Sequence, residues 1–246
     1  MLDDQNLNTI EQVMEKTPGI TVYDSPMGGK YFYSRGFRMT GQYQYDGVPL
    51  DMGSSYVQAD SFNSDMAIYD RVEVLRGAAG MMKGAGGTAG GVNFVRKRGQ
   101  DTAHTQLSLS AGTWDNYRGQ VDTGGPLNDA GTIRGRAVVT EQTRQYFYDV
   151  ASRKDQIYYG ALDFDLSPDT TLGLGFAWED VDATPCWGGL PRYADGSDLH
   201  LKRSTCLNTA WNNQRSKRAT YFADLKHQFN DDWSLKVAGV YSRNTQ

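Results

Sequence analysis

The stretch VEVLRGAAGMMKGAGGTAGGVNFVRKRG, Val72–Gly99, joins two short β-branched runs through a connector rich in glycine. The flanking runs, Val72–Leu75 and Val92–Val95, have the composition of strands. The glycines are Gly77, Gly80, Gly84, Gly86, Gly87, Gly90 and Gly91. Glycine at this density indicates either repeated left-handed backbone or a close approach of the chain to another group.

A phosphate-binding loop is one explanation for these glycines. Gly84, Gly86 and Ala89 fit the loose dinucleotide-binding pattern. The following segment, Gly91–Arg98, is strand-like, so the helix N-terminus that would bind a pyrophosphate is not expected. Lys83 is followed by glycine, which breaks the Walker pattern as well. A nucleotide-binding α/β enzyme is therefore a disfavoured alternative.

The composition excludes several other classes of protein. The chain has 246 residues and a net charge of −4, which does not indicate nucleic-acid binding. Cys186 and Cys206 lack Cys-x-x-Cys spacing and the three histidines are scattered, so no metal site is expected. Aromatic residues make up 12% of the chain, and no apolar run approaches the length of a membrane helix. This mixture suits a soluble β protein or an outer-membrane barrel.

The region before Gly99 has a mixed α/β pattern. A helix is expected over residues 3–16, where Leu7 and Ile10 begin an apolar helical spacing. Residues 51–66 are polar and loop-like, and Asp60 and Asp65 within them are expected to be solvated. Short strands separated by turn residues are expected over residues 20–23, 31–34 and 42–45.

After Gly99 the pattern changes to long strands with strict alternation. In residues 106–111, for example, Leu107 and Leu109 share one face and Ser108 and Ser110 share the other. The same alternation is found in residues 133–144, 158–166, 172–179 and 233–241. Short links alternate with longer ones, as in a transmembrane barrel with short turns at one rim. A soluble antiparallel sheet with one buried face stays open as the alternative.

Ordered motifs along almost the whole chain resemble the TonB-dependent siderophore receptors of bacterial outer membranes. The segments that resemble the plug domain of that family are Thr17–Val22, Ser34–Phe37, Tyr45–Pro49, Tyr69–Gly77 and Gly91–Lys97. The segments that look like the first barrel strands of the ferripyoverdine and coprogen receptor branch are Gly112–Arg118, Gly135–Ala137, Tyr158–Gly160 and Phe164–Asp169.

The resemblance implies a fold in two parts. Residues 1–100 would form an α+β plug domain, incomplete at its N-terminus, and residues 101–246 would form the first seven or so antiparallel strands of a transmembrane β-barrel. Because the family closes a barrel of about 22 strands, the barrel in this chain is expected to be open. The glycines then serve close packing, and Arg134, Arg136, Asp163 and Asp165 would face the plug across a hydrated lumen.

The resemblance also creates expectations about the chain ends. No secretory signal is recognisable in the first 20 residues, and the segment that recruits the TonB energy-coupling protein is not found. An aromatic-ended last strand is not found either. The chain is therefore expected to be a fragment of a longer receptor and to be inactive alone.

The implied function is binding and gated import of a ferric siderophore at the bacterial outer membrane, without catalysis. The ferric siderophore would be the transported ligand, and no cofactor is expected. The expected partners are TonB and outer-membrane lipid, and nucleic acid is not among them. A cobalamin or haem receptor on the same scaffold is the nearest alternative; His200 alone among the loop residues argues against haem, which usually needs axial histidines.

The resemblance places ligand contacts at the plug apex and on the long loop. Arg35, with Tyr31 and Tyr33, would contact the siderophore, although pairing of Arg35 with a plug carboxylate stays open. The remaining expectations are pocket walls at Trp187 and Trp211, ion pairs inside the plug or to the barrel at Arg71 and Arg76, and a disulfide between Cys186 and Cys206.

Overall fold

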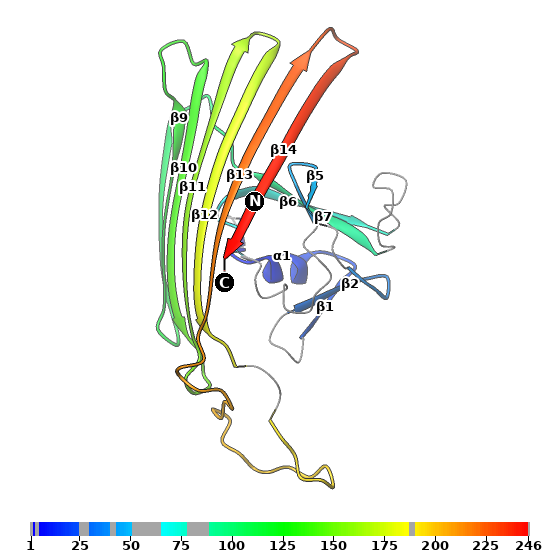
Figure 1. Ribbon diagram of the computed structural model, residues 1–246, viewed down its shortest axis with the longest axis vertical. Helices are drawn as coiled ribbons and strands as arrows, with labels where there is room; N and C mark the ends of the chain where they lie inside the picture. The colour runs from blue at the N-terminus through cyan, green and yellow to red at the C-terminus, as the bar shows by residue number, and fades with distance from the viewer. Residues whose placement is uncertain are drawn as a thin grey trace.

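The computed structural model describes residues 2, 5–24, 30–39, 43–50, 65–77, 89–186 and 190–245. It places a small α+β unit beside one face of a large curved sheet (Figure 1). The described residues before Gly99 are called the plug below, and the large sheet is called the wall. The wall forms the left of Figure 1, and the plug lies to its right.

The plug contains one short helix, α1, Ile10–Lys16. Thr9 precedes it with extended backbone, and its side chain accepts a hydrogen bond from the Gln12 amide while the Gln12 side chain accepts from the Thr9 amide. This capping box fixes the first turn, so the expected start near residue 3 was wrong. Across the described residues, no helix is long and apolar enough to span a membrane.

Two small sheets complete the plug. The first contains β1 (Ile20–Asp24), β2 (Lys30–Ser34) and β3 (Phe37–Arg38) in sequential antiparallel order. The second has the order β5-β4-β7-β6, with bounds Val48–Leu50, Tyr43–Tyr45, Gly90–Arg96 and Tyr69–Arg76. The strand expected after the glycine-rich connector is thus confirmed as β7, while residues 78–88 of the connector lie outside the described chain.

Aromatic side chains fill the plug core. Tyr45 and Tyr69 lie beside Phe94, with ring centroids 5.5 Å and 5.0 Å from it. Burial raises the pKa of Tyr45 to about 12, because the apolar core disfavours the charged phenolate. The two sheets and α1 are therefore held by an apolar centre.

The wall is a meander of long antiparallel strands. In the described chain it contains seven, with the edges β8 and β14 unpaired to each other, so the expected open partial barrel is confirmed. The strands are β8 (His104–Gly112), β9 (Asn116–Pro126), β10 (Ile133–Gln145), β11 (Ser152–Ser167), β12 (Thr170–Thr184), β13 (Gln214–Gln228) and β14 (Ser234–Thr245).

The two faces of the wall differ in chemistry. Leu109, Leu162 and Val237 are exposed on the face away from the plug. On the opposite face, Val138 and Phe222 are buried and belong to the same apolar cluster as the plug core. The inward face is therefore not uniformly wet, because its middle packs directly against the plug.

The two rims of the wall also differ. Residues 127–132, 168–169 and 229–233 make the short turns at one rim, and residues 113–115, 146–151 and 185–213 connect strands at the other. In Figure 1 the long connection between β12 and β13 extends downward, and β1 and β2 form the side of the plug nearest that rim. The β1–β3 sheet thus lies toward the rim that carries the longest loop.

Candidate functional site

Arg35 occupies a tight turn between β2 and β3. Ser34 pairs with Phe37, and both Arg35 and Gly36 have positive φ, 52° and 82°. This is the geometry of a two-residue type I′ turn, which normally takes asparagine or glycine at its first position. A left-handed backbone costs a non-glycine residue about 1–2 kcal/mol. Arg35 does not continue the extended face of Tyr33, because β2 ends at Ser34.

The Arg35 side chain is exposed and lies against the end of β6. Its guanidinium is close to Gly77, where an added Cβ would be 3.1 Å from Arg35 Nη1. Within the described residues, Arg35 forms no ion pair with a carboxylate. The structural role left open by the sequence is therefore not realised in that part of the chain.

Tyr31 and Tyr33 lie on one face of β2, opposite the buried Phe32 and Ser34. Tyr31 pairs across the strands with Tyr23, whose side chain is 65% exposed. The Arg38 guanidinium carbon lies 3.8 Å from the centroid of the Tyr31 ring. The sequence reasoning missed Tyr23 and Arg38. The alternation in residues 20–24 could have indicated Tyr23, because it places Tyr23 and Val22 on opposite faces of the strand.

The long loop carries the other residues predicted to bind ligand. Trp211 is 84% exposed, and Trp187 lies outside the described residues. No described ring contact joins Trp211 to the β2 tyrosines, so the structure does not bring these groups together. Cys186 and Cys206 are bonded, with Cα atoms 5.8 Å apart.

An aromatic cluster at the same rim escaped the sequence reasoning. Tyr146 stacks on Tyr148, and Phe147 lies edge-on to Trp114. The Arg203 guanidinium lies 4.9 Å from the Phe147 ring centroid, which links the long loop to residues 146–151. The run Tyr-Phe-Tyr in a strand connection is the signal that could have indicated this cluster.

The long loop is also hydrogen-bonded to the link 146–151. Asp149 N donates to Ser204 O at 2.6 Å, and Ser204 Oγ donates to Asp149 Oδ2 at 3.2 Å. Neither residue was singled out from the sequence. The two connections therefore form one structured part of the rim.

The plug is attached to the wall by three basic residues, Arg96 at the end of β7 and Lys97 and Arg98 directly after it. Lys97 Nζ lies 2.8 Å from Asp122 Oδ2 on β9, and both side chains are almost fully buried. Arg136 donates two further hydrogen bonds of 2.8 Å to the same carboxylate. These charges pair directly, so the expectation of a hydrated gap at Arg136 was wrong.

Two arginines extend this attachment to β11 and β13. Arg96 and Arg98 both pair with Asp224, and Arg98 also pairs with Asp163. Gly173 and Gly175 on β12 make room for them: an added Cβ at Gly173 would overlap Arg98, and one at Gly175 would overlap Arg96. Inward-facing glycines on this strand therefore allow two guanidinium groups to approach the backbone.

A second attachment joins β9 to the plug through Arg118 and Asp65. The two side chains form a buried, two-point ion pair. The expectation that Asp65 is solvated was therefore wrong; Asp60 lies outside the described residues. Arg134 instead pairs with Asp165 within the wall, at 2.6 Å.

The remaining plug arginines have local roles. Arg71 pairs with Glu73 at 2.8 Å and with Asp70, which confirms an internal plug pair. Hydrogen bonds from Asn93 and from Arg71 hold the pKa of Glu73 below its usual value. Arg76 differs from expectation, because it donates to the Pro18 carbonyl at 2.7 Å and has no described carboxylate partner.

The described residues contain no group of three metal-ligating side chains. What the β1–β3 sheet offers is the exposed guanidinium of Arg35 at its turn, together with the tyrosines of β2 and the Arg38 guanidinium over Tyr31. Such a pair of groups suits an oxygen-rich ligand, because guanidinium donates paired hydrogen bonds and the rings supply flat contact area.

Comparisons with known proteins agree with this architecture. The profile of the TonB-dependent receptor plug domain family matches residues 1–92. The chain is 98% identical over its whole length to the ferric-pyoverdine M114 receptor PbuA of Pseudomonas sp. strain M114, of which it covers 30%. It is 41% identical over 96% of its length to the ferripyoverdine receptor of Pseudomonas aeruginosa, of which it covers 29%.

A solved structure gives the same result in three dimensions. The pyoverdine outer membrane receptor FpvA from P. aeruginosa PAO1, bound to pyoverdine, superimposes with a TM-score of 0.89 at 40% identity. The match covers 99% of this chain and 36% of that one. The chain therefore spans about a third of the length of the proteins it matches.

Proposed function

Because the chain belongs to the TonB-dependent siderophore receptors, we propose that it forms the plug and first strands of an outer-membrane receptor that binds and imports a ferric siderophore. The family consists of transporters rather than enzymes, so a nucleotide-binding enzyme is not retained. The iron chelate is the transported ligand. Outer-membrane lipid surrounds the wall, whose face away from the plug is apolar.

The observation that carries the proposal is the position of Arg35. An arginine in a left-handed turn costs stability that asparagine or glycine would not cost. Strained backbone conformations of this kind cluster at ligand-binding and other functional sites. With no described carboxylate beside it, the exposed guanidinium can donate paired hydrogen bonds to the chelating oxygens of a siderophore.

The tyrosines of β2 complete the contact. Tyr31 and Tyr33 lie on the partly exposed face of β2, and tyrosine supplies flat contact area to a ligand; the Tyr31 ring already stacks with Arg38, so this guanidinium belongs to the same surface. Tyr23 extends the same face. Trp187 and Trp211 are proposed to contact the ligand from the long loop, with the loop held by the disulfide Cys186–Cys206.

The transport step requires movement of the plug. TonB would pull on a segment that precedes the plug, and the ligand site near the β2–β3 turn would be disrupted by that pull. The buried ion pairs of Lys97 and Arg98 keep the other end of the plug attached to the wall. Release of the ligand thus requires no chemistry at the site.

Iron uptake by the full-length receptor tests the proposal. Iron-starved cells that lack their own receptor should take up iron-55 as the ferric siderophore when they carry the wild-type gene. Purified Arg35→Ala receptor should bind the ferric siderophore more weakly by about 1.5–3 kcal/mol, the value of a charged hydrogen bond. Arg71→Ala is the matched control, since Arg71 pairs within the plug.

The outcome separates the alternatives. Equal affinity of the wild-type and Arg35→Ala receptors, at matched thermal stability, would assign Arg35 a structural role. Uptake of haem or cobalamin instead of a ferric siderophore would replace the proposed ligand. Neither alternative is favoured by any observation on the described residues.

A further inference from the structure

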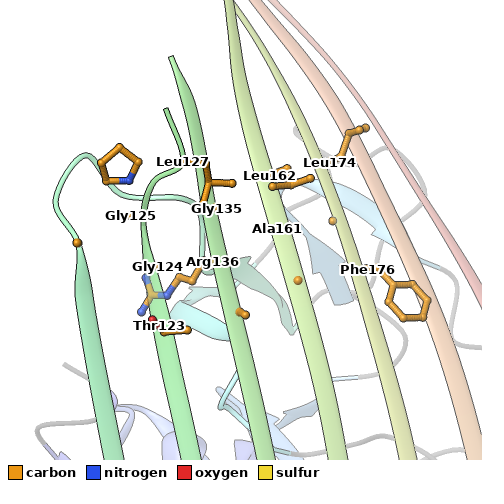
Figure 2. A pocket seen from close by; sticks show the side chains of 15 residues that line it. Thr123, Gly124, Gly125, Leu127, Gly135, Arg136, Ala161, Leu162, Leu174 and Phe176 are labelled. Atoms are coloured by element: carbon orange, nitrogen blue, oxygen red, sulfur yellow. The ribbon is translucent and has the colours of Figure 1, made fainter. Parts of the chain in front are cut away.

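An apolar groove crosses the outward face of the wall near the short-turn rim (Figure 2). Its volume is about 650 Å³, and strands β9 to β12 contribute to it. Gly135, Ala137 and Gly160 form its floor, and Leu127, Leu162 and Phe176 form its walls. All four strands have both neighbours in place, so the open edges of the sheet do not create the groove.

Small residues at neighbouring positions explain the hollow. Gly160 pairs with Ala137 on one side and with Phe176 on the other. A Cβ added at Gly160 would have no atom within 4 Å. Leu127 folds from the turn over Gly135, where an added Cβ would be 2.9 Å from it. The floor therefore lies at backbone level, while the surrounding side chains rise above it.

The groove offers no partner for a charged ligand. Arg136 borders it, but its guanidinium is bonded to Asp122 on the inward face. The other lining residues carry no charge. An occupant must therefore be apolar and narrow, and it must gain mainly from dispersion contacts and removal from water.

The surroundings of the groove indicate which apolar occupant is available. Tyr158 and Trp178 lie side by side on the outward face, with ring centroids 5.5 Å apart. Further toward the long-loop rim, the outward positions become charged, as at Lys154 and Lys217. Aromatic residues followed by charges mark the edge of the hydrocarbon layer in transmembrane barrels. The groove lies on the hydrocarbon side of that edge and is continuous with the lipid-facing surface.

We propose that this groove binds one acyl chain of a membrane phospholipid. The inference rests on the proposed outer-membrane location. A flexible alkyl chain can follow the floor from Gly135 to Gly160 and fill the space between Leu127 and Phe176. The lipid is then held longer than its neighbours, because three glycine or alanine positions let it approach the backbone.

Native mass spectrometry of the full-length receptor with added palmitoyl-oleoyl phosphatidylethanolamine tests this. Gly160→Leu, whose added Cβ meets no atom within 4 Å, places a side chain in the groove and should lower the affinity for the most tightly held lipid at least tenfold. Ala137→Leu, a second filling variant, should do the same. Ala223→Leu adds the same side chain to an outward position on β13 outside the groove and should retain the lipid.

Equal lipid retention in the wild-type receptor and all variants would overturn the proposal. A loss of lipid in Ala223→Leu as large as in Gly160→Leu and Ala137→Leu would overturn it as well. A receptor dimer that Gly160→Leu abolishes while lipid retention is unchanged would assign the groove to a protein contact. Ferric siderophore affinity, measured on the same samples, should be the same in all of them. If the wild-type receptor retains the lipid but does not bind the ferric siderophore, the proposed function is contradicted and the lipid proposal is not.

Discussion

Two arginines of the plug have opposite surroundings. Arg98 lies between Asp163 and Asp224 of the wall, and both carboxylates are buried. Arg35 is exposed on a strained turn, without a described carboxylate partner. The same side chain is thus used once to fix the plug in place and once, we propose, to meet a ligand. The difference lies in whether the described part of the chain supplies the partner charge.

The two arginines also differ in the free energy that is lost when their contacts are broken. A buried ion pair is costly to break, because the remaining charge is left without solvent or partner. An exposed arginine can gain or lose a ligand at little cost to the fold. The wall attachment should therefore control stability, and the β2–β3 turn should control affinity.

The largest expected effect is at Asp224, which pairs with both Arg96 and Arg98. Asp224→Asn should destabilise the attachment of the plug in the full-length receptor by about 3 kcal/mol, the lower end for a broken buried ion pair, because buried Arg96 then keeps only Asp46 and partly exposed Arg98 keeps only Asp163. Urea denaturation in detergent measures the change. Asp129→Asn, in an exposed turn, is the control and should be neutral; equal stabilities of the two variants would contradict the role given to Asp224.

The next effect concerns the long loop. The Cys186–Cys206 disulfide closes a loop over a sequence separation of 20 and should contribute about 3 kcal/mol to folding stability. Cys186→Ser with Cys206→Ser should speed protease cleavage within residues 190–213 and leave the wall intact. Mass spectrometry under non-reducing conditions decides the bond itself, and two alkylatable thiols on exported receptor would rule it out.

Gly173 probes how closely the plug approaches the wall. A Cβ there would overlap Arg98 and lie 2.8 Å from Asp224 Oδ1. Gly173→Ala should therefore cost about 1–3 kcal/mol, as overpacking does. Gly239→Ala on β14, where an added Cβ meets nothing within 4 Å, is the matched control. Equal thermal unfolding of the two variants would show that the arginines move aside without cost.

The smallest effect separates stability from affinity at Arg35. Arg35→Asn places the residue type preferred in a type I′ turn before Gly36, so the plug should gain about 1 kcal/mol of stability. Siderophore affinity should fall in the same variant. Arg35→Lys, which keeps the charge and the strain but loses the paired donors, should lower affinity alone. A variant that gains stability with unchanged affinity would remove Arg35 from the proposed site.

Local patterns predicted much of the fold. Alternation in residues 106–111 and 158–166 indicated strands with one apolar face, and the structure has β8 and β11 there. The start of α1 was misplaced because the apolar spacing was extended past the capping Thr9. The strand over residues 31–34 was expected, but the left-handed conformation of Arg35 after it was not.

Partners distant in sequence were beyond such reasoning. Asp65 was expected to be solvated because its neighbours are polar, yet it is buried against Arg118. The aromatic cluster of Tyr146 and Phe147 was missed because its contacts come from other loops.

The sequence by itself determined the strand character of five wall strands and the family resemblance, because alternation and turn residues act locally; β9 and β13 were not among the predicted alternating strands. Only the tertiary structure decided which charges meet. Lys97 reaches Asp122 across 25 positions, and Arg98 reaches Asp224 across 126. No local pattern encodes such pairs, because a buried charge selects its partner by the packing of the whole chain around it.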